Sequence, residues 1–224
     1  MNRLFFSIFG AVVISLCQAS SIRPAKPNHY FFTPTAYMNK PFELVGSLHE
    51  SSYSLPYNFQ AFGSWADNIG RINFGARYGI LDNLSVAAGL AWSFITFDHG
   101  GHGIHHAFQP RFGTYLCWGF VTTPNFEAAL TPHVQLGDHI SAGGDFGMMI
   151  TPNEFWSVIG EFGFSFDFDD QIPYFNTIWG ARVHPPDIPF LSFDCGLDFV
   201  ESPPERFARR FWPFIDVVFT MKTM

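Results

Sequence analysis

The chain has 224 residues, of which 47% are hydrophobic and 29 are phenylalanine. Its formal net charge is −7, because 12 basic residues stand against 19 acidic ones, and this balance argues against nucleic acid as a partner, which would need a basic face. Lysine occurs only at Lys26, Lys40 and Lys222, which excludes an ordinary soluble surface with lysine spread over it.

The first 19 residues have the features of a secretory signal peptide. Arg3 supplies the positive start, residues 4–16 the apolar core, and residues 17–19 a small-residue cleavage site. The core is too short for a transmembrane helix, and no later segment has the roughly 18 apolar residues that a spanning helix needs. Cleavage leaves 11 basic and 19 acidic residues, a net charge of −8. Lipidation of Cys17 is the alternative, but the bulky Leu16 before it fits that chemistry poorly.

Residues 20–40 contain three prolines, so we expect an irregular periplasmic lead-in there. After it, segments of about ten residues alternate large apolar side chains with small or charged ones. This period of two is typical of a β-strand, whose successive side chains leave opposite faces. The predicted strands are 42–52, 71–80, 84–97, 107–121, 126–136, 140–150, 155–167, 175–184, 190–200 and 211–221. Ten is an even number, as in bacterial outer-membrane barrels. We therefore predict an all-β fold, an antiparallel up-and-down transmembrane β-barrel over residues 41–224.

The lengths of the connections support this prediction independently. Short turns alternate with longer connections along the chain. The short turns are at 81–83, 122–125, 151–154 and 185–189, and the longer connections are at 54–70, 98–106, 168–174 and 201–210. On the side of the longer connections, only 137–139 is short. The short turns contain Asp, Asn and Pro, which are typical turn residues. Short periplasmic turns alternating with longer external loops are characteristic of outer-membrane barrels.

Alternation alone does not decide which face of the wall is wet. A soluble lipocalin-like barrel would enclose the apolar face, but residues such as Phe74, Trp92 and Trp118 would overfill a ten-stranded interior. The opposite face carries Gly, Ala, Ser and a few charges, which fit inside. We therefore expect the large apolar side chains to face lipid. By the same parity Cys117 and Cys195 lie on opposite faces, and we expect both to be unpaired.

The inward face brings together most of the charged residues. The predicted lumen-lining residues are Glu43, Arg71, Arg77, Arg111, Glu127, His133, Asp145, Glu161, Arg182, Asp194, Asp198 and Asp216. Charges inside a barrel cost less when they are paired or hydrated, so one interpretation is a network of Arg–carboxylate pairs that fills the lumen. The other is a narrow polar pore whose selectivity these residues tune.

Two connections carry further hypotheses. His99, His102, His105 and His106 lie in one glycine-rich loop and form a candidate metal site, because neutral imidazole is a common metal ligand. The alternative is an ordinary solvated loop. Another loop ends in Arg206, Arg209 and Arg210. One hypothesis is that their guanidinium groups bind lipopolysaccharide phosphates, and the alternative is a mixed-charge solvated loop.

Two short segments resemble known barrels. Residues 77–86, with Tyr78-Gly79 followed by Asp82-Asn83-Leu84, resemble the strand–turn–strand cassette of small bacterial outer-membrane barrels. Residues 33–36 (Thr-Pro-Thr-Ala) and 42–46 (Phe-Glu-Leu-Val-Gly) look like the lead-in of YjbH-like and related porin-like proteins. The resemblance implies an outer-membrane barrel connected with envelope or exopolysaccharide biology, and it implies no catalytic residue.

We therefore predict an outer-membrane protein with a narrow polar lumen, acting in envelope structure or as a slow pore for small solutes. The alternatives are an accessory barrel in polysaccharide or protein export and, less well supported, a lipid- or peptide-modifying enzyme. No motif orders the loop residues that could act in catalysis, so we predict no enzymatic activity and no cofactor. The expected partners are membrane lipid, lipopolysaccharide and the barrel-assembly machinery, and not nucleic acid.

Overall fold

The alternating segments form strands in the computed structural model, which describes residues 34–47, 51–63, 71–93, 96–97, 104–105, 109–123, 125–137, 140–201 and 210–223. The strands are β1 (Glu43–Gly46), β2 (Ser51–Leu55), β3 (Phe59–Gly63), β4 (Arg71–Leu81), β5 (Leu84–Ser93), β6 (Thr96–Phe97), β7 (Ile104–His105), β8 (Gln109–Thr122), β9 (Phe126–Leu136), β10 (Ser141–Asn153), β11 (Trp156–Asp167), β12 (Ile172–Val183), β13 (Leu191–Glu201) and β14 (Arg210–Lys222). Within these ranges no helix is long and apolar enough to cross a membrane.

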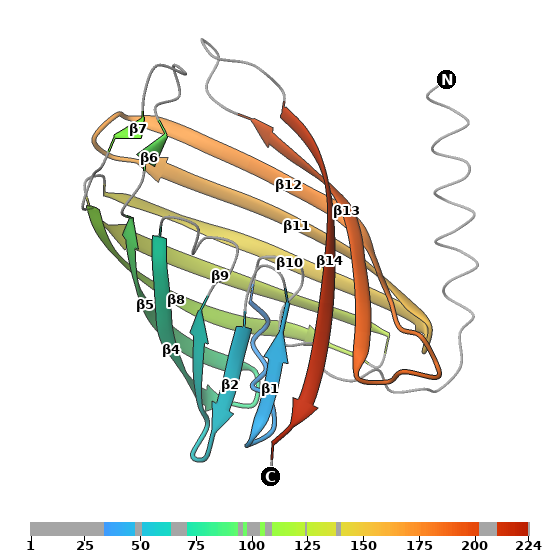
Figure 1. Cartoon of the computed structure of the whole chain (residues 1–224). Coiled ribbons are helices and arrows are strands. Elements are labelled where there is room, and N and C mark those ends of the chain that lie inside the picture. Colours follow the sequence, from blue (N-terminus) through green and yellow to red (C-terminus); the bar gives the residue numbers. More distant parts are fainter. Residues whose placement is uncertain are drawn as a thin grey trace, which may run out of the picture.

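Twelve of the strands form one closed antiparallel barrel (Figure 1). Neighbours along the chain are neighbours in the wall, except that β5 pairs with β8 because β6 and β7 form a separate two-stranded sheet. The barrel closes where β1 pairs with β14, from Glu43↔Lys222 to Gly46↔Phe219. Just beyond β14, the Thr223 amide donates a hydrogen bond to the Phe42 carbonyl oxygen at 2.8 Å. Both ends of the wall therefore meet at the same rim.

The prediction of a closed antiparallel barrel is confirmed, but the predicted number of ten strands is wrong. The predicted strand 42–52 is divided between β1 and β2, and the predicted loop 54–70 contains β3. Pro56, Tyr57 and Asn58 connect β2 to β3, and the last two have positive φ angles of 64° and 61°. Strands of four and five residues hold only two or three alternations, so their pattern is too short to separate from a loop.

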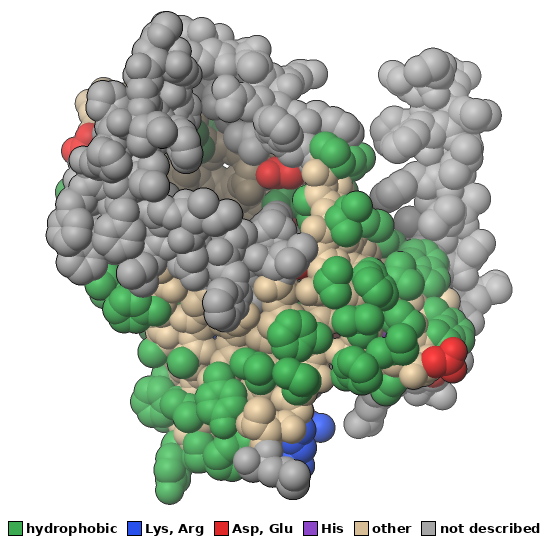
Figure 2. All heavy atoms as spheres, viewed as in Figure 1, with side chains coloured by type: hydrophobic (Ala, Val, Ile, Leu, Met, Phe, Trp, Pro, Cys, Tyr) green, Lys and Arg blue, Asp and Glu red, His purple; other side chains and the backbone are tan. Residues whose placement is uncertain are grey.

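Large apolar side chains cover the outside of the wall (Figure 2). Phe74 is 56% exposed and Trp118 is 48% exposed, and further exposed outward side chains are Phe112, Phe162, Phe164 and Phe193. A chain of aromatic rings runs along β8 and then across to β10, β11 and β12: Trp118–Phe120, Phe120–Phe146, Phe146–Phe162 and Phe162–Trp179 have centroid distances of 5.7, 6.0, 6.1 and 5.2 Å. On the visible face of the barrel, charged side chains appear at the ends of the wall (Figure 2).

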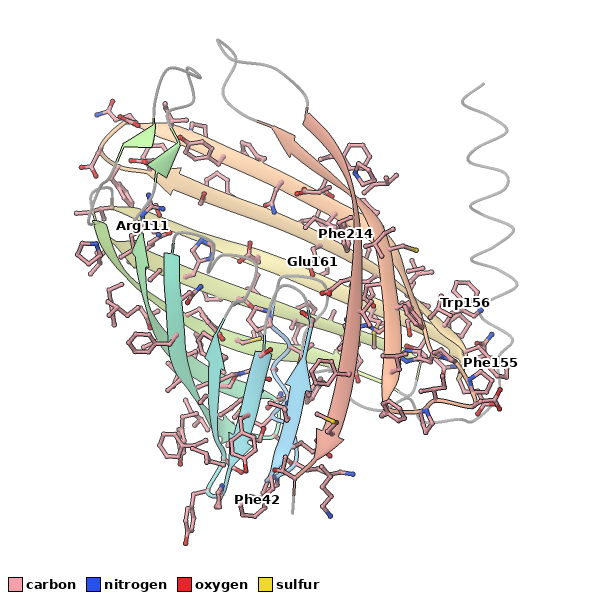
Figure 3. All side chains as sticks on the ribbon, viewed as in Figure 1. Phe42, Arg111, Phe155, Trp156, Glu161 and Phe214 are labelled. Carbon is pink, nitrogen blue, oxygen red and sulfur yellow. The ribbon has the colours of Figure 1, made fainter. Side chains whose placement is uncertain are left out.

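The interior contains an apolar cluster as well as polar side chains. Its buried members are Ala36, Cys117, Ala129, Met149, Ile159 and Ile178, with Tyr115 and Phe214 packed against them. Inward glycines make room for rings: the Phe214 ring lies where a Cβ on Gly196 would be, and Phe62 covers Gly75 in the same way. Phe214 and Glu161 lie between the two ends of the barrel (Figure 3). The interior is therefore more apolar than the sequence pattern predicts.

Candidate functional site: the barrel lumen

Part of the predicted lead-in lies inside the barrel. Residues 34–40, which we call the enclosed segment, are irregular, and Thr35, Ala36 and Tyr37 in it are buried. The Cys117 thiol, on the inward face of β8, donates a hydrogen bond to the Pro34 carbonyl oxygen at 3.1 Å. The enclosed segment leads directly to β1 at the turn end, the end of the barrel where β4 joins β5, β8 joins β9, β10 joins β11 and β12 joins β13. We call the opposite end the loop end.

The wall is shaped to accept the enclosed segment. A Cβ on Gly119 would lie 3.1 Å from the Ala36 Cβ and 3.3 Å from the Tyr37 hydroxyl. A Cβ on Gly79, in β4, would lie 2.8 Å from the Met38 Cγ. Both glycines therefore stand where a larger residue would press against the segment. In contrast, a Cβ on Gly113, on the same strand and face as Gly119, would meet nothing within 4 Å.

Tyr37 brings the enclosed segment close to lumenal polar groups. Burial, together with electrostatic repulsion of the phenolate by the nearby Glu127 and Cys117, raises the pKa of its phenol to about 12. Glu127 is itself buried, and Thr131 donates a hydrogen bond to the Cys117 sulfur at 3.2 Å. The phenol of Tyr37 is therefore neutral at physiological pH, as its enclosed position favours.

A buried charged cluster lies on β12, β13 and β14 near the turn end. Arg182 Nε and Nη2 donate hydrogen bonds to Asp194 Oδ1 and Oδ2, each at 2.8 Å, and both side chains are buried. Arg182, Asp194 and Asp216 are register neighbours across the three strands, so one row contains one cation and two anions. This is the Arg–carboxylate pairing that the inward face predicts, here in bidentate form.

Hydroxyl groups complete this part of the lumen. The Thr151 and Ser157 hydroxyls lie 2.9 Å apart next to the β10–β11 turn. His184 Nδ1 lies 3.0 Å from the Ser192 hydroxyl, two residues along the chain from Arg182 and Asp194. In a Ser-His-Asp triad the serine hydroxyl binds the other ring nitrogen, Nε2, and the acid holds Nδ1. The His184–Ser192 bond therefore closes the hairpin and does not have the geometry of an activated nucleophile.

Other predicted lumenal residues are separate from this cluster. His133 Nδ1 lies 3.1 Å from Asp145 Oδ2, and both side chains are about one-quarter exposed. Arg111 lies near the loop end (Figure 3), where its Cγ is close to Gly137. Glu161 is buried, and Asp198 is half-buried with Oδ1 lacking a hydrogen-bond partner. The charged residues thus share a face but form several groups along the lumen.

The remaining predicted residues are at the rim or outside the described part of the chain. Glu43 lies at the turn-end rim, where its Oε2 accepts a hydrogen bond from the Lys40 amide at 3.0 Å. The Arg71 side chain lies outside the described residues, as do His99, His102 and His106; His105 belongs to β7, but its side chain is not described. The histidine metal site therefore stays a prediction. Among the described residues, no group of three or more His, Cys, Asp or Glu could hold a metal ion.

Uncharged polar side chains also line the lumen, and although the pattern assigns serines to the inward face, the predicted site residues include only charged side chains and histidine. The buried ones are Thr35, Ser47, Ser52, Ser54, Gln60, Ser85, Thr131, Thr151 and Ser157. Those on long strands share the inward parity of the charged residues, and that parity is the signal by which they could be found. Ser52, Ser54 and Gln60 lie on β2 and β3, which the pattern does not resolve.

Comparison with known proteins shows a fold and no family. No protein-family model matches the sequence, and no curated protein matches it significantly. A solved structure described as a "Bacterial polysaccharide outer membrane secretin" is similar with a TM-score of 0.51 and 9% identity, over 83% of this chain and 77% of that one. An "Anion-selective porin from Comamonas acidovorans" gives a TM-score of 0.43 and 11% identity, over 77% of this chain and 58% of the porin. At such identity the first likeness supports a shared barrel fold and nothing finer.

Proposed function

We propose that this chain is an outer-membrane β-barrel of low permeability, which acts in envelope structure or passes small solutes slowly. The observation that carries the proposal is the distribution of side chains across a single wall. Outside are exposed phenylalanines and Trp118, and inside are buried Arg, Glu, Asp, Ser and Thr. In water this arrangement would expose a large apolar surface and bury charge, whereas in a bilayer both faces are favourable.

The lengths of nine of the twelve wall strands agree with a membrane location, whereas β1, β2 and β3 have four, five and five residues. β4, β5 and β8–β14 have 10–14 residues each, and a tilted transmembrane strand needs about 9–11. The fold shared with an outer-membrane secretin supports the same placement. The strand order is also closed, because β1 pairs with β14 from Glu43↔Lys222 to Gly46↔Phe219, as expected for a barrel that spans a bilayer. We expect outer-membrane lipid to be the main partner, the barrel-assembly machinery to insert the chain, and lipopolysaccharide to bind the arginines at 206–210.

Low permeability follows from what occupies the lumen. The enclosed segment lies against β4 and β8, and the apolar cluster of Met149, Ile159 and Ile178 lies across the same interior. A hydrated ion that crosses this region would have to displace packed apolar side chains, which disfavours conduction. We therefore place the chain nearer to a closed barrel than to an open porin, and we expect no enzymatic activity.

A second candidate is an accessory role in polysaccharide or protein export, which the fold likeness to a polysaccharide secretin favours. The enclosed segment would have to leave the lumen during export. This candidate therefore predicts conductance that rises steeply when residues 34–40 are deleted and falls when a linear polysaccharide is added.

Two measurements test the main proposal. The mature protein should require detergent for extraction and should migrate differently on gels before and after heating, as folded outer-membrane barrels do. In planar bilayers its conductance should be far below that of 16–18-stranded porins. A mature protein that is soluble without detergent would rule out the membrane assignment. Stable porin-sized channels in the wild-type protein would rule out the closed lumen.

A further inference from the structure

We propose that Arg77, together with Ser54 and Asn39, binds a small oxyanion, a carboxylate or a phosphate, inside the barrel. The site lies in the sector of β2, β3 and β4, beside the enclosed segment (Figure 1). It is separate from the Arg182–Asp194 cluster and does not depend on whether the lumen conducts.

Arg77 is a buried cation with an unused donor. Its side chain is 3% exposed, and Nε donates a hydrogen bond to the Ser85 hydroxyl at 2.8 Å. Nη2 is buried and has no hydrogen-bond partner. The lumenal ion pairs Arg182–Asp194 and His133–Asp145 do not include Arg77. A buried guanidinium with an unsatisfied donor is unfavourable unless a further acceptor binds it.

Ser54 provides a second unsatisfied group in the same row. Ser54 pairs in register with Gln60, and Gln60 pairs with Arg77, so the three buried side chains point into the lumen side by side. Neighbouring strands are about 4.8 Å apart, which places the Ser54 and Arg77 backbones roughly 10 Å apart across β3. The long arginine side chain can cover much of that distance. The Ser54 hydroxyl is buried and has no hydrogen-bond partner.

Asn39 provides a third unsatisfied group from the enclosed segment. Its Nδ2 is buried without a hydrogen-bond partner. The preceding residue, Met38, lies against Gly79, which follows Arg77 on the same inward face of β4. The segment therefore brings an amide donor to the sector that already holds the guanidinium and the hydroxyl.

All three groups can donate hydrogen bonds, and this determines the class of ligand. A guanidinium fork matches the two oxygens of a carboxylate or phosphate, while amide and hydroxyl donors can satisfy the remaining lone pairs. Arg77 and Tyr37 both interact electrostatically with Cys117, and Glu127 interacts with Tyr37. Glu127 thus shares a neighbour with Arg77, so we expect its carboxylate to weaken anion binding and its neutralisation to strengthen it.

Thermal unfolding of the full mature protein in detergent tests the site. Sodium chloride is replaced stepwise by sodium acetate or sodium phosphate while the ionic strength is kept constant. A ligand that binds only the folded state raises the unfolding temperature with concentration. We expect at least one oxyanion to do so in the wild type, and about a tenfold weaker apparent affinity in Arg77→Lys, which keeps the charge but loses the fork. Ser54→Ala and Asn39→Ala should each weaken the response, and Glu127→Gln should strengthen it.

Arg111→Lys, near the loop end, is the matched control and should respond like the wild type. The proposal is overturned if neither oxyanion stabilises the wild type more than chloride, as expected if only water occupies the site. The proposal would also be overturned if Arg77→Lys, Ser54→Ala and Asn39→Ala all responded to the oxyanion as strongly as the wild type does. If Arg77→Lys does not fold, the two alanine variants decide, because they remove a donor and leave the charge in place. Channel recordings are a separate readout, so failure of anion binding leaves the closed-barrel proposal intact.

Discussion

Asp194 lies directly opposite Asp216 on the paired strands β13 and β14, and both carboxylates are buried, with exposed fractions of 1% and 2%. Two like charges at opposite positions of a sheet destabilise it unless a cation compensates them. Arg182, on the other side of Asp194, makes the bidentate pair and is that cation. The stability of this region therefore depends more on the arginine than on either acid.

This relationship predicts unequal costs for the two halves of the ion pair. Arg182→Gln leaves two adjacent buried carboxylates, and we expect a loss of about 3–5 kcal/mol in the free energy of unfolding. Asp194→Asn should cost less, because Asp216 remains as a charge partner for Arg182. Denaturant titration in detergent, followed by circular dichroism, measures both. A cost for Asp194→Asn equal to or above that of Arg182→Gln would contradict the assignment.

The fit between the wall and the enclosed segment predicts the effect of adding one methyl group. Gly119→Ala places a Cβ 3.1 Å from the Ala36 Cβ, so it should loosen the segment and cost about 1–3 kcal/mol. Labelling of the Cys117 thiol by a maleimide, in a Cys195→Ser background, should become faster. Gly113→Ala, on the same strand and face but in open space, is the control and should label like the wild type. Equal labelling of both variants would show that Gly119 does not position the segment.

The outer wall makes a parallel prediction. A Cβ on Gly160 would lie 2.7 Å from the Trp179 ring and 3.0 Å from the Met148 terminal methyl. Gly160→Ala should therefore displace Trp179, shift its fluorescence and lower stability by about 1–3 kcal/mol. Gly144→Ala, whose nearest neighbour would be 3.6 Å away, should leave both unchanged. An unshifted spectrum in Gly160→Ala would mean that the ring does not rest on the glycine.

His184, in the β12–β13 connection, predicts a dependence of stability on pH. Burial lowers the pKa of its imidazole below the usual 6.5, and Arg182 lowers it further. The unfolded chain therefore binds this proton more readily than the folded chain, so the contribution of His184 is complete well above pH 6.5 and is lost as the pH falls through and below that value. Between pH 8 and pH 5, the free energy of unfolding of the wild type should fall relative to that of His184→Gln. A difference that is constant with pH would contradict the lowered pKa.

The long strands could be predicted from the sequence because they repeat their pattern many times. In β4 and β13, for example, residues 71–80 and 191–199 alternate regularly, and the structure places Phe74 and Phe193 outside and Arg77 and Asp194 inside. Cys117 and Cys195 are both free, with Cys117 buried and Cys195 exposed, as the parity predicts. Alternation along a strand thus identifies which side chains face the interior, even where it does not identify the side chains that they pair with.

Other features depend on tertiary contacts that no local pattern encodes. Thr35, Ala36 and Tyr37 have no period that would indicate burial, and they are enclosed because Gly79 and Gly119 leave space on strands far along the chain. The apolar residues inside, such as Phe214, break the expectation of a polar lumen because Gly196 opposite accepts the ring. Pairing between side chains likewise requires the register, which places Arg182 beside Asp194.

The enclosed segment also has a mechanical consequence. It continues directly into β1, which is joined to β14 by four register pairs and to β2 by three, whereas β13 and β14 share ten. A pull that withdraws residues 34–40 from the lumen is transmitted through Lys40 and Phe42 to this short strand before it reaches any other. The wall should therefore yield first at β1, and traction on the N-terminal side of the chain would open the barrel sideways, along its weakest seam.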